Sequence, residues 1–271
     1  MRLYLASTSP ARRALLAQSG IEPVHVAPGV DEDAAVAAVA SALGRDLTGP
    51  ELVAMLAIEK AAAVADAPLA DDAAAPAAGA PIDGFVFGGD SAFEVDGVLY
   101  GKPHDPAVAR DRWRQMLAAG GGTLWSGHCV IDRRRALDTT DDRPGGAGRA
   151  RTAPPVRTVD ASGGGPLGLA GSVADVAPGG SGLVADGDRV VAVDSAVLTF
   201  AEDMSPEEID AYVATGEPLE VAGAFTIDGR AAAYITRIDG APSAVVGLSL
   251  PVLRSMLLRG FGIAWHDLWA L

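Results

Sequence analysis

Residues 3–16 read LYLASTSPARRALL, and this stretch decides the fold at the start of the chain. The apolar run at 3–6 predicts a short buried strand. Ser9 and Pro10 then predict the cap and first turn of a helix that ends near Gln18, with Gly20 as its stop signal. A strand that leads directly into a helix is the unit from which α/β folds are built.

The same alternation continues along the chain. Thr48 and Glu51 form a capping-box pattern before a second helix. The run FVFG (85–88) predicts a second buried strand, which places Asp90 at its carboxyl end. Later signals predict a hairpin at 93–99, helices from Asp105, Ser205 and Pro251, a strand at 190–200, and two strands at 222–227 and 231–238. Together these elements predict an α/β fold.

Two segments lack such periodicity. Residues 65–83 are mostly Ala, Asp and Pro, which predicts a loop. Residues 133–188 begin with three arginines and continue as a low-complexity stretch, which we interpret as a flexible insertion without a role in chemistry. Regular signals resume at Val190.

Composition excludes several classes of protein. The 271 residues suffice for one large domain or two small ones, and the net charge of −14 argues against stable nucleic-acid binding. One cysteine, Cys129, allows no internal disulfide, which suits a reducing cytoplasm. We find neither a secretory signal nor a membrane span and expect a cytoplasmic protein. The acidic charge repels polyphosphates, so a phosphate site would have to be a local basic pocket.

The first candidate for chemistry is Ser7–Arg13, which follows a strand and opens a helix. The free N–H groups of a helix N-terminus attract phosphate, and hydroxyls and guanidiniums add donors for its oxygens. A capped helix with exposed arginines would show the same sequence.

The second candidate is Asp90 in Gly88–Ser91. A carboxylate after a buried strand lies where α/β folds place catalytic groups, and it could bind a divalent cation or activate water. A turn aspartate after glycine is the simpler interpretation.

The chain has only two lysines, Lys60 and Lys102, among 21 basic residues. An arginine-rich chain that keeps two lysines suggests a need for compact ammonium groups, although chance explains the count equally well. Lys102 lies in Tyr100–Pro103, and the acidic cluster Asp31–Asp33 could share a metal or form a solvated turn.

Other patterns are interpreted as coincidental. Residues 163–168 fit GxGxxG, but no strand precedes them and a proline interrupts them, so a dinucleotide fingerprint is rejected. The sequence has no Walker A motif, GxSxG elbow or zinc-ligand spacing. Cys129 is predicted to be a core residue.

In combination, the segments resemble the Maf family of nucleoside triphosphate pyrophosphatases, in the form found in actinobacteria. The resemblance covers most of the chain outside 65–83 and 133–188 and implies one catalytic domain over 1–271. The matching pieces are LASTSPARRALL (5–16), VDED (30–33), LAIEKA (56–61), GGDS (88–91), YGKP (100–103), SGH (126–128), TGEPLEVAGAFTIDG (215–229) and GAPSAVVGLSLP (240–251).

The resemblance implies a two-lobed α/β fold around a strongly twisted mixed sheet, and a homodimer. It also implies hydrolysis of a nucleoside triphosphate to its monophosphate and pyrophosphate with a divalent metal, Mg²⁺ or Mn²⁺. By motif, Asp90 is the catalytic carboxylate and Glu32 its metal partner. The implied phosphate contacts are Ser7, Arg12, Arg13, Lys60 and Lys102.

Three positions correspond to those that set base specificity in the family: Ala11, Ser91 and Asp228. Members of the dTTP/UTP type have Arg, Thr and Gln there, whereas members of the 7-methyl-GTP type have a bulky residue first and an acid third. Asp228 favours the second type, because a carboxylate can accept from a guanine N–H edge. Ala11 fits neither, so the preferred base stays open.

Three alternatives to a pyrophosphatase remain at this stage. A metal-dependent phosphatase would release orthophosphate instead of pyrophosphate. A nucleotide-binding regulator of cell division would bind without turnover. A binding module built on the arginine-rich insertion would not need the candidate site at all.

Overall fold

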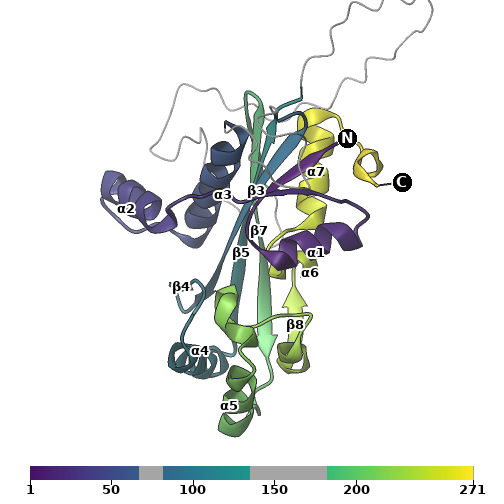
Figure 1. Ribbon diagram of the computed structural model, residues 1–271. Helices are drawn as coiled ribbons and strands as arrows, with labels where there is room; N and C mark the ends of the chain where they lie inside the picture. The colour runs from purple at the N-terminus through teal and green to yellow at the C-terminus, as the bar shows by residue number, and fades with distance from the viewer. Residues whose placement is uncertain (67–81, 135–181, 271) are drawn as a thin grey trace, which may run out of the picture.

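The computed structural model describes residues 1–66, 82–134 and 182–270. Within them the strands form one twisted, mixed sheet of eight strands in the order β2-β1-β3-β5-β7-β6, with β4 paired to β3 and β8 to β7 (Figure 1). The strands are β1 (Leu3–Ala6), β2 (Val24–Val26), β3 (Phe85–Val95), β4 (Val98–Tyr100), β5 (Gly121–Asp132), β6 (Gly182–Asp186), β7 (Arg189–Phe200) and β8 (Ile235–Asp239). The first strands are parallel and the rest antiparallel, which confirms the predicted mixed α/β fold.

Helices surround the two ends of this sheet and give the molecule two lobes (Figure 1). The α-helices are α1 (Pro10–Gln18), α2 (Glu32–Leu43), α3 (Gly49–Ala65), α4 (Pro106–Ala119), α5 (Pro206–Ala214), α6 (Pro242–Val245) and α7 (Leu250–Phe261). Short 3-10 helices are η2 (Glu217–Glu220), η3 (Ala222–Ala224), η4 (Arg230–Tyr234) and η5 (Trp265–Leu268). Among the helices of the described residues, none combines the length and apolarity needed to cross a bilayer.

The predicted helix starts are confirmed by their caps. The side chains of Ser9, Asp105 and Ser205 accept hydrogen bonds from the first turns of α1, α4 and α5. A proline follows each cap, where its missing N–H costs nothing and its fixed φ favours the helix. Glu51 closes the capping box at the start of α3.

Two glycines bring α3 unusually close to the sheet. A Cβ added to Gly88 would lie 2.2 Å from the carbonyl oxygen of Ala57, and one added to Gly127 would lie 1.9 Å from that of Val53. Side chains at either position would push the helix away from β3 and β5. The glycines therefore set the distance at which residues on α3 reach the sheet.

On the opposite face, α1 and α7 cover the same part of the sheet through apolar contacts. Leu16 of α1 and Leu253 of α7 pack in one buried cluster with Leu5, Phe87 and Val130 of the strands. A separate cluster at the other end joins α4 and α5 to β3, β5 and β7.

One edge of β3 is only partly covered. Strand β5 pairs with β3 along residues 85–94. On the other edge, β1 ends opposite Gly88, and the antiparallel β4 ends at Tyr100, opposite Phe93. Within the described chain, residues 89–92 therefore have a strand partner on one side only. Asp90 lies inside β3, and its predicted place at the end of the strand is wrong, because the double glycine continues the ladder instead of ending it.

Two further expectations differ from the structure. Residues 222–227 and 231–238 do not form a strand hairpin: the 3-10 helices η3 and η4 lie in this region, and only 235–239 is a strand. Gly223 and Ala224 have φ of 79° and 62°, which a strand does not accommodate. Residues 182–186, which lie inside the predicted insertion 133–188, form the strand β6, which pairs with β7. The rest of the two low-complexity segments, 67–81 and 135–181, and the GxGxxG match at 163–168 lie outside the described residues.

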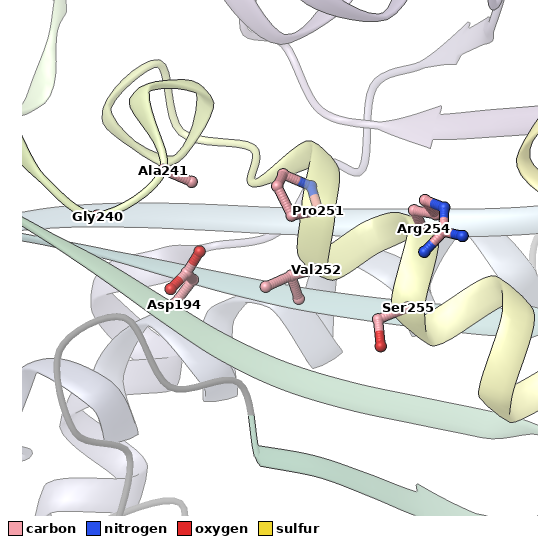
Figure 2. A pocket seen from close by; sticks show the side chains of 7 residues that line it. All are labelled: Asp194, Gly240, Ala241, Pro251, Val252, Arg254 and Ser255. Atoms are coloured by element: carbon pink, nitrogen blue, oxygen red, sulfur yellow. The ribbon is translucent and has the colours of Figure 1, made fainter.

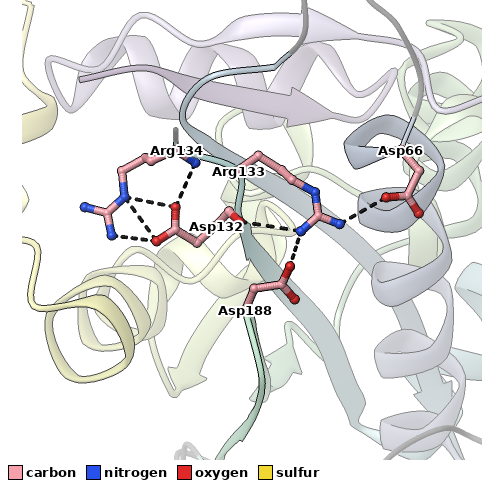
Figure 3. A network of polar contacts seen from close by, with 5 residues as sticks. All are labelled: Asp66, Asp132, Arg133, Arg134 and Asp188. Atoms are coloured by element: carbon pink, nitrogen blue, oxygen red, sulfur yellow. Dashed lines mark hydrogen bonds and ion pairs between the residues drawn. The ribbon is translucent and has the colours of Figure 1, made fainter. Parts of the chain in front are cut away.

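A polar network ties together the chain ends next to these segments (Figure 3). Arg133 contacts Asp66 at the end of α3, at 3.0 Å, and Asp188 in the turn between β6 and β7. Arg134 binds Asp132 with its side chain and stacks over an aromatic ring of the core. The network thus joins α3, β5 and the β6–β7 turn at one end of the sheet.

Candidate active site

Arg12 is the centre of the first polar cluster. It is 8% exposed, and it donates from Nε to the carbonyl of Gly247 at 2.7 Å. Its two terminal nitrogens donate to Ser7 Oγ at 3.1 Å and to Ser91 Oγ at 2.8 Å. Burial lowers the pKa of Arg12, while the charges of Asp90 and Glu32 raise it. The guanidinium keeps its charge and is held by the loop before α1, by β3 and by the segment before α7.

Lys60 is the centre of the second cluster. It comes from α3, is 7% exposed, and its Nζ lies 2.7 Å from Asp90 Oδ1 and 2.8 Å from Glu32 Oε1. Asp90 is also nearly buried, whereas Glu32 is half-exposed in the first turn of α2. The close approach of α3 at Gly88 explains why a lysine on that helix reaches a strand carboxylate.

The two clusters meet at the partly covered edge of β3. Asp90 points to the face covered by α3, since it binds Lys60. Ser91, the next residue, points to the face covered by α1 and α7, since it binds Arg12. Because β1 ends at Ala6, side chains from both faces gather around residues 89–92 at this edge. The N-terminus of α1 follows Ser7 in the chain. The backbone N–H of Ser9, the cap residue of α1, donates to Ser7 Oγ.

Residues 240–250 form a wall beside Arg12. Ser126 Oγ donates to the carbonyl of Ala244 at 2.8 Å, which fixes α6 to β5. The carbonyl of Gly247 accepts from Arg12, and a Cβ added to Gly247 would lie 2.7 Å from Ser91 Oγ. The glycine therefore permits the close contact between this wall and the Arg12 cluster.

His128 was not among the predicted site residues. It lies inside β5, fully buried, and its Nε2 accepts the backbone N–H of Ser249 at 2.8 Å. Burial, with a smaller contribution from Arg12, lowers the pKa of His128 to about 3. The SGH segment drew attention only through the family resemblance, because a hydrogen bond to a distant backbone N–H leaves no local pattern.

The remaining predicted phosphate contacts are exposed. Arg13 lies on the outer side of α1, and Lys102 lies in the loop after β4. Arg112 of α4, which the sequence did not single out, donates to the carbonyl of Gly101 and stacks over the Tyr100 ring at 4.6 Å. The nearly buried guanidinium of Arg112 thus holds the loop that carries Lys102.

The three predicted specificity positions have different surroundings. Ala11 is half-buried in the first turn of α1, and Ser91 is a hydrogen-bond partner of Arg12. Asp228 is exposed in the loop between η3 and η4. Glu217 holds this loop, because its carboxylate accepts from Thr226 Oγ1 at 2.7 Å and from the backbone N–H of Arg230 at 2.9 Å.

The donor set for a divalent metal is small. Glu32 and Asp90 approach the same point, which the Lys60 ammonium occupies. Across the described residues, no group of three or more His, Cys, Asp or Glu side chains is arranged to hold a metal. Mg²⁺ in nucleotide sites commonly takes one or two carboxylates, with water and phosphate oxygens as the other ligands. The pair therefore fits a metal that arrives with a triphosphate.

A cleft of about 340 Å³ lies elsewhere, between β7 and the start of α7 (Figure 2). It is lined by Asp194, Gly240, Ala241, Pro251, Val252, Arg254 and Ser255. Asp194 is buried and accepts the backbone N–H of Ser195 at 2.9 Å. None of the lining residues is a predicted site residue, although Gly240 and Ala241 also belong to the wall beside Arg12.

Cys129 is a core residue, as predicted. It is fully buried against α3, and burial raises the pKa of its thiol to about 12. A thiol with this pKa is a poor nucleophile, so the site does not depend on cysteine chemistry.

Comparisons with known proteins identify the family of this chain. The family model for Maf-like protein matches residues 2–145 and 169–260. A nucleoside triphosphate pyrophosphatase of Leifsonia xyli is 44% identical, over 99% of this chain and 97% of its own. Proteins with the same name from Nocardia farcinica (39% identical, 98% and 96% covered) and Streptomyces coelicolor (37%, 99% and 95%) are also similar. The chain therefore belongs to the Maf family.

Proposed function

We propose that this protein hydrolyses a nucleoside triphosphate between its α and β phosphates, releasing the nucleoside monophosphate and pyrophosphate. One observation carries the proposal: Arg12 and Lys60, two nearly buried cations, lie on either side of Asp90 at the partly covered edge of β3. The names of the similar proteins support the same reaction. The reaction belongs to the hydrolases that act on acid anhydrides.

In the proposed reaction, Asp90 accepts a proton from a water molecule while the water oxygen bonds to the α phosphorus, next to the α–β bridging oxygen. The bond from that phosphorus to the bridging oxygen breaks, and pyrophosphate leaves. Lys60 contacts Asp90 Oδ1 and thereby fixes the orientation of the carboxylate. Geometry of this kind is the first requirement for a general base.

The second requirement is that the negative charge that develops on the phosphates is stabilised. Ser7, Arg12 and the N-terminus of α1 supply donors next to one another, and Lys60 lies across the edge of β3. Lys102 and Arg13 are exposed and free to reach phosphate oxygens from solvent. Preorganised cations and N–H groups of this kind stabilise a transferring phosphoryl group.

Mg²⁺ or Mn²⁺ would be held by Asp90 and Glu32 together with phosphate oxygens. When bound, it supplies Lewis-acid polarisation of the phosphate. Lys60 would then have to share its two carboxylates with the metal, since Glu32 and Asp90 both contact its ammonium.

The proposal includes a cytoplasmic location and a homodimer. The single cysteine, buried and unpaired, is compatible with a reducing compartment. The homodimer rests on the family resemblance.

Product analysis tests the reaction. The purified protein is incubated with Mg²⁺ or Mn²⁺ and a panel of standard and modified nucleoside triphosphates, and monophosphate, pyrophosphate and orthophosphate are measured together. We expect equimolar monophosphate and pyrophosphate. The ranking of bases also tests whether Asp228 recognises a guanine N–H edge.

The same measurement separates the proposed reaction from two of the three alternatives. Orthophosphate as the first product would indicate a metal-dependent phosphatase. Nucleotide binding without turnover in any metal would indicate a regulator. Either result would contradict the proposed reaction.

A further inference from the structure

His128 occupies an unusual place for a histidine. The residue belongs to the central strand β5, and its side chain is fully buried. The centroid of its ring lies 5.9 Å from the centroid of the Phe87 ring. Its Nε2 accepts the backbone N–H of Ser249 at 2.8 Å, so the ring proton is assigned to Nδ1, which is buried and has no hydrogen-bond partner among the described residues. The low pKa of about 3 keeps the ring neutral throughout the physiological range. His128 therefore acts as a permanent acceptor for one distant backbone N–H.

That backbone N–H belongs to the wall beside Arg12. Ser249 caps α7 and lies two residues after Gly247, whose carbonyl accepts Arg12 Nε at 2.7 Å. The other end of the wall is fixed by Ser126, whose Oγ donates to the carbonyl of Ala244. Ser126 and His128 are two residues apart on β5 and therefore lie on the same face. Together they hold both ends of the segment that aims Arg12.

We propose that His128 is a positioning residue: by accepting the Ser249 N–H, it fixes the Gly247 carbonyl and thereby the direction of the Arg12 guanidinium. This inference rests on the proposed function, in which Arg12 binds the phosphates. An acceptor is required at this point because the Ser249 N–H is buried, and a buried N–H without a partner is costly. The wall would otherwise shift to reach another acceptor.

A matched pair of amides tests the acceptor. In His128→Gln the amide oxygen reaches the position of Nε2, whereas in His128→Asn the shorter side chain stops near Nδ1. We expect Gln to keep kcat/KM within a few-fold of the wild type. Asn should lose about 10²-fold, the cost of a small misplacement in an active site. Cys129→Ala, on the neighbouring buried residue, is the packing control and should leave kcat/KM unchanged.

A double-mutant cycle with Arg12→Ala separates positioning from a general loss of stability. If His128 acts through Arg12, adding His128→Asn to Arg12→Ala should cause little further loss. A merely structural role would lower activity by the same factor in both backgrounds. Equal factors would overturn the proposal, as would wild-type kcat/KM in folded His128→Asn.

Two further measurements keep the test decisive. If His128→Asn does not fold, His128→Leu replaces it in the cycle, because leucine fills similar space without an acceptor. The cycle is repeated on the affinity for a non-hydrolysable nucleoside triphosphate analogue. If the wild type binds the analogue but does not turn over nucleotide, the proposed function fails while the binding cycle still decides whether His128 positions Arg12.

Discussion

At the scale of single residues, the sequence predicted the charged groups of the site better than the groups that hold them. The strand before Asp90, the scarcity of lysine and the helix N-terminus near Arg12 left each of these residues open, and the family resemblance made Asp90, Lys60 and Arg12 predicted site residues. The structure adds that Lys60 contacts both Asp90 and Glu32. The supporting roles of His128 and Arg112 were not predictable, because each depends on a backbone group that only the folded chain brings close.

Glu51 gives a pH-dependent prediction at the same scale. Its carboxylate accepts two hydrogen bonds from Arg45 and one from the backbone N–H of Thr48. The hydrogen bonds from Arg45 are the main cause of its pKa, which is lowered to about 2. A lowered carboxyl pKa stabilises the fold above the unfolded pKa, and this stabilisation is lost as the pH falls toward 2.

The measurement compares urea unfolding of the wild type and Glu51→Gln. At pH 7 the variant should have a free energy of unfolding lower by about 1 kcal/mol, the usual value of a helix cap. The difference should narrow as the pH falls from about 4.5 toward 2, because in this range the unfolded wild type binds a proton at Glu51 that the folded protein does not bind. Glu59→Gln, exposed on the same helix, is the control. A difference that does not change with pH would refute this role of the charge.

At the scale of elements, helix starts were predictable and the lengths of strands were not. Caps and prolines are local signals, and they placed α1, α3, α4 and α5 correctly. Gly88 and Gly89 read as a strand end, but they lie inside β3, where Gly88 makes room for the backbone of α3. The alternating residues at 222–238 satisfied a strand pattern, yet the positive φ of Gly223 and Ala224 turns the chain into 3-10 helix. In both places tertiary packing decides the backbone.

The packing of α3 against the sheet gives a prediction at this scale. In Gly127→Ala the new methyl group would lie 1.9 Å from the carbonyl oxygen of Val53, so the helix must move. We expect the free energy of unfolding to fall by about 1–3 kcal/mol, the usual cost of overpacking a core. Because α3 carries Lys60, turnover should also fall in the folded protein.

Gly101→Ala is the matched control for stability, because no atom lies within 4 Å of the added Cβ. It should change the free energy of unfolding by less than about 0.5 kcal/mol, as is usual away from special features. Equal free energies of unfolding of the two variants in chemical denaturation would contradict the prediction, because they would show that a methyl group fits between Gly127 and α3.

At the scale of the whole molecule, a net charge of −14 repels a phosphate substrate, but the positive groups of the candidate site are gathered in one place. Arg12, Lys60 and the N-terminus of α1 concentrate positive charge at one edge of β3. The alternation of strands and helices was enough to predict the α/β class. The strand order was not predictable, since the pairing of β3 with β5 joins residues 29 to 47 positions apart, which no local pattern encodes.

The central claim is that Asp90 performs the hydrolysis between Arg12 and Lys60, and Asp90→Asn tests it most directly. The asparagine keeps the size of the side chain but cannot accept a proton from water. We expect the folded variant to bind nucleoside triphosphate, with pyrophosphate release slowed by about 10²–10⁴-fold, the usual contribution of a general base. Pyrophosphate release at a near-normal rate by Asp90→Asn would contradict the account.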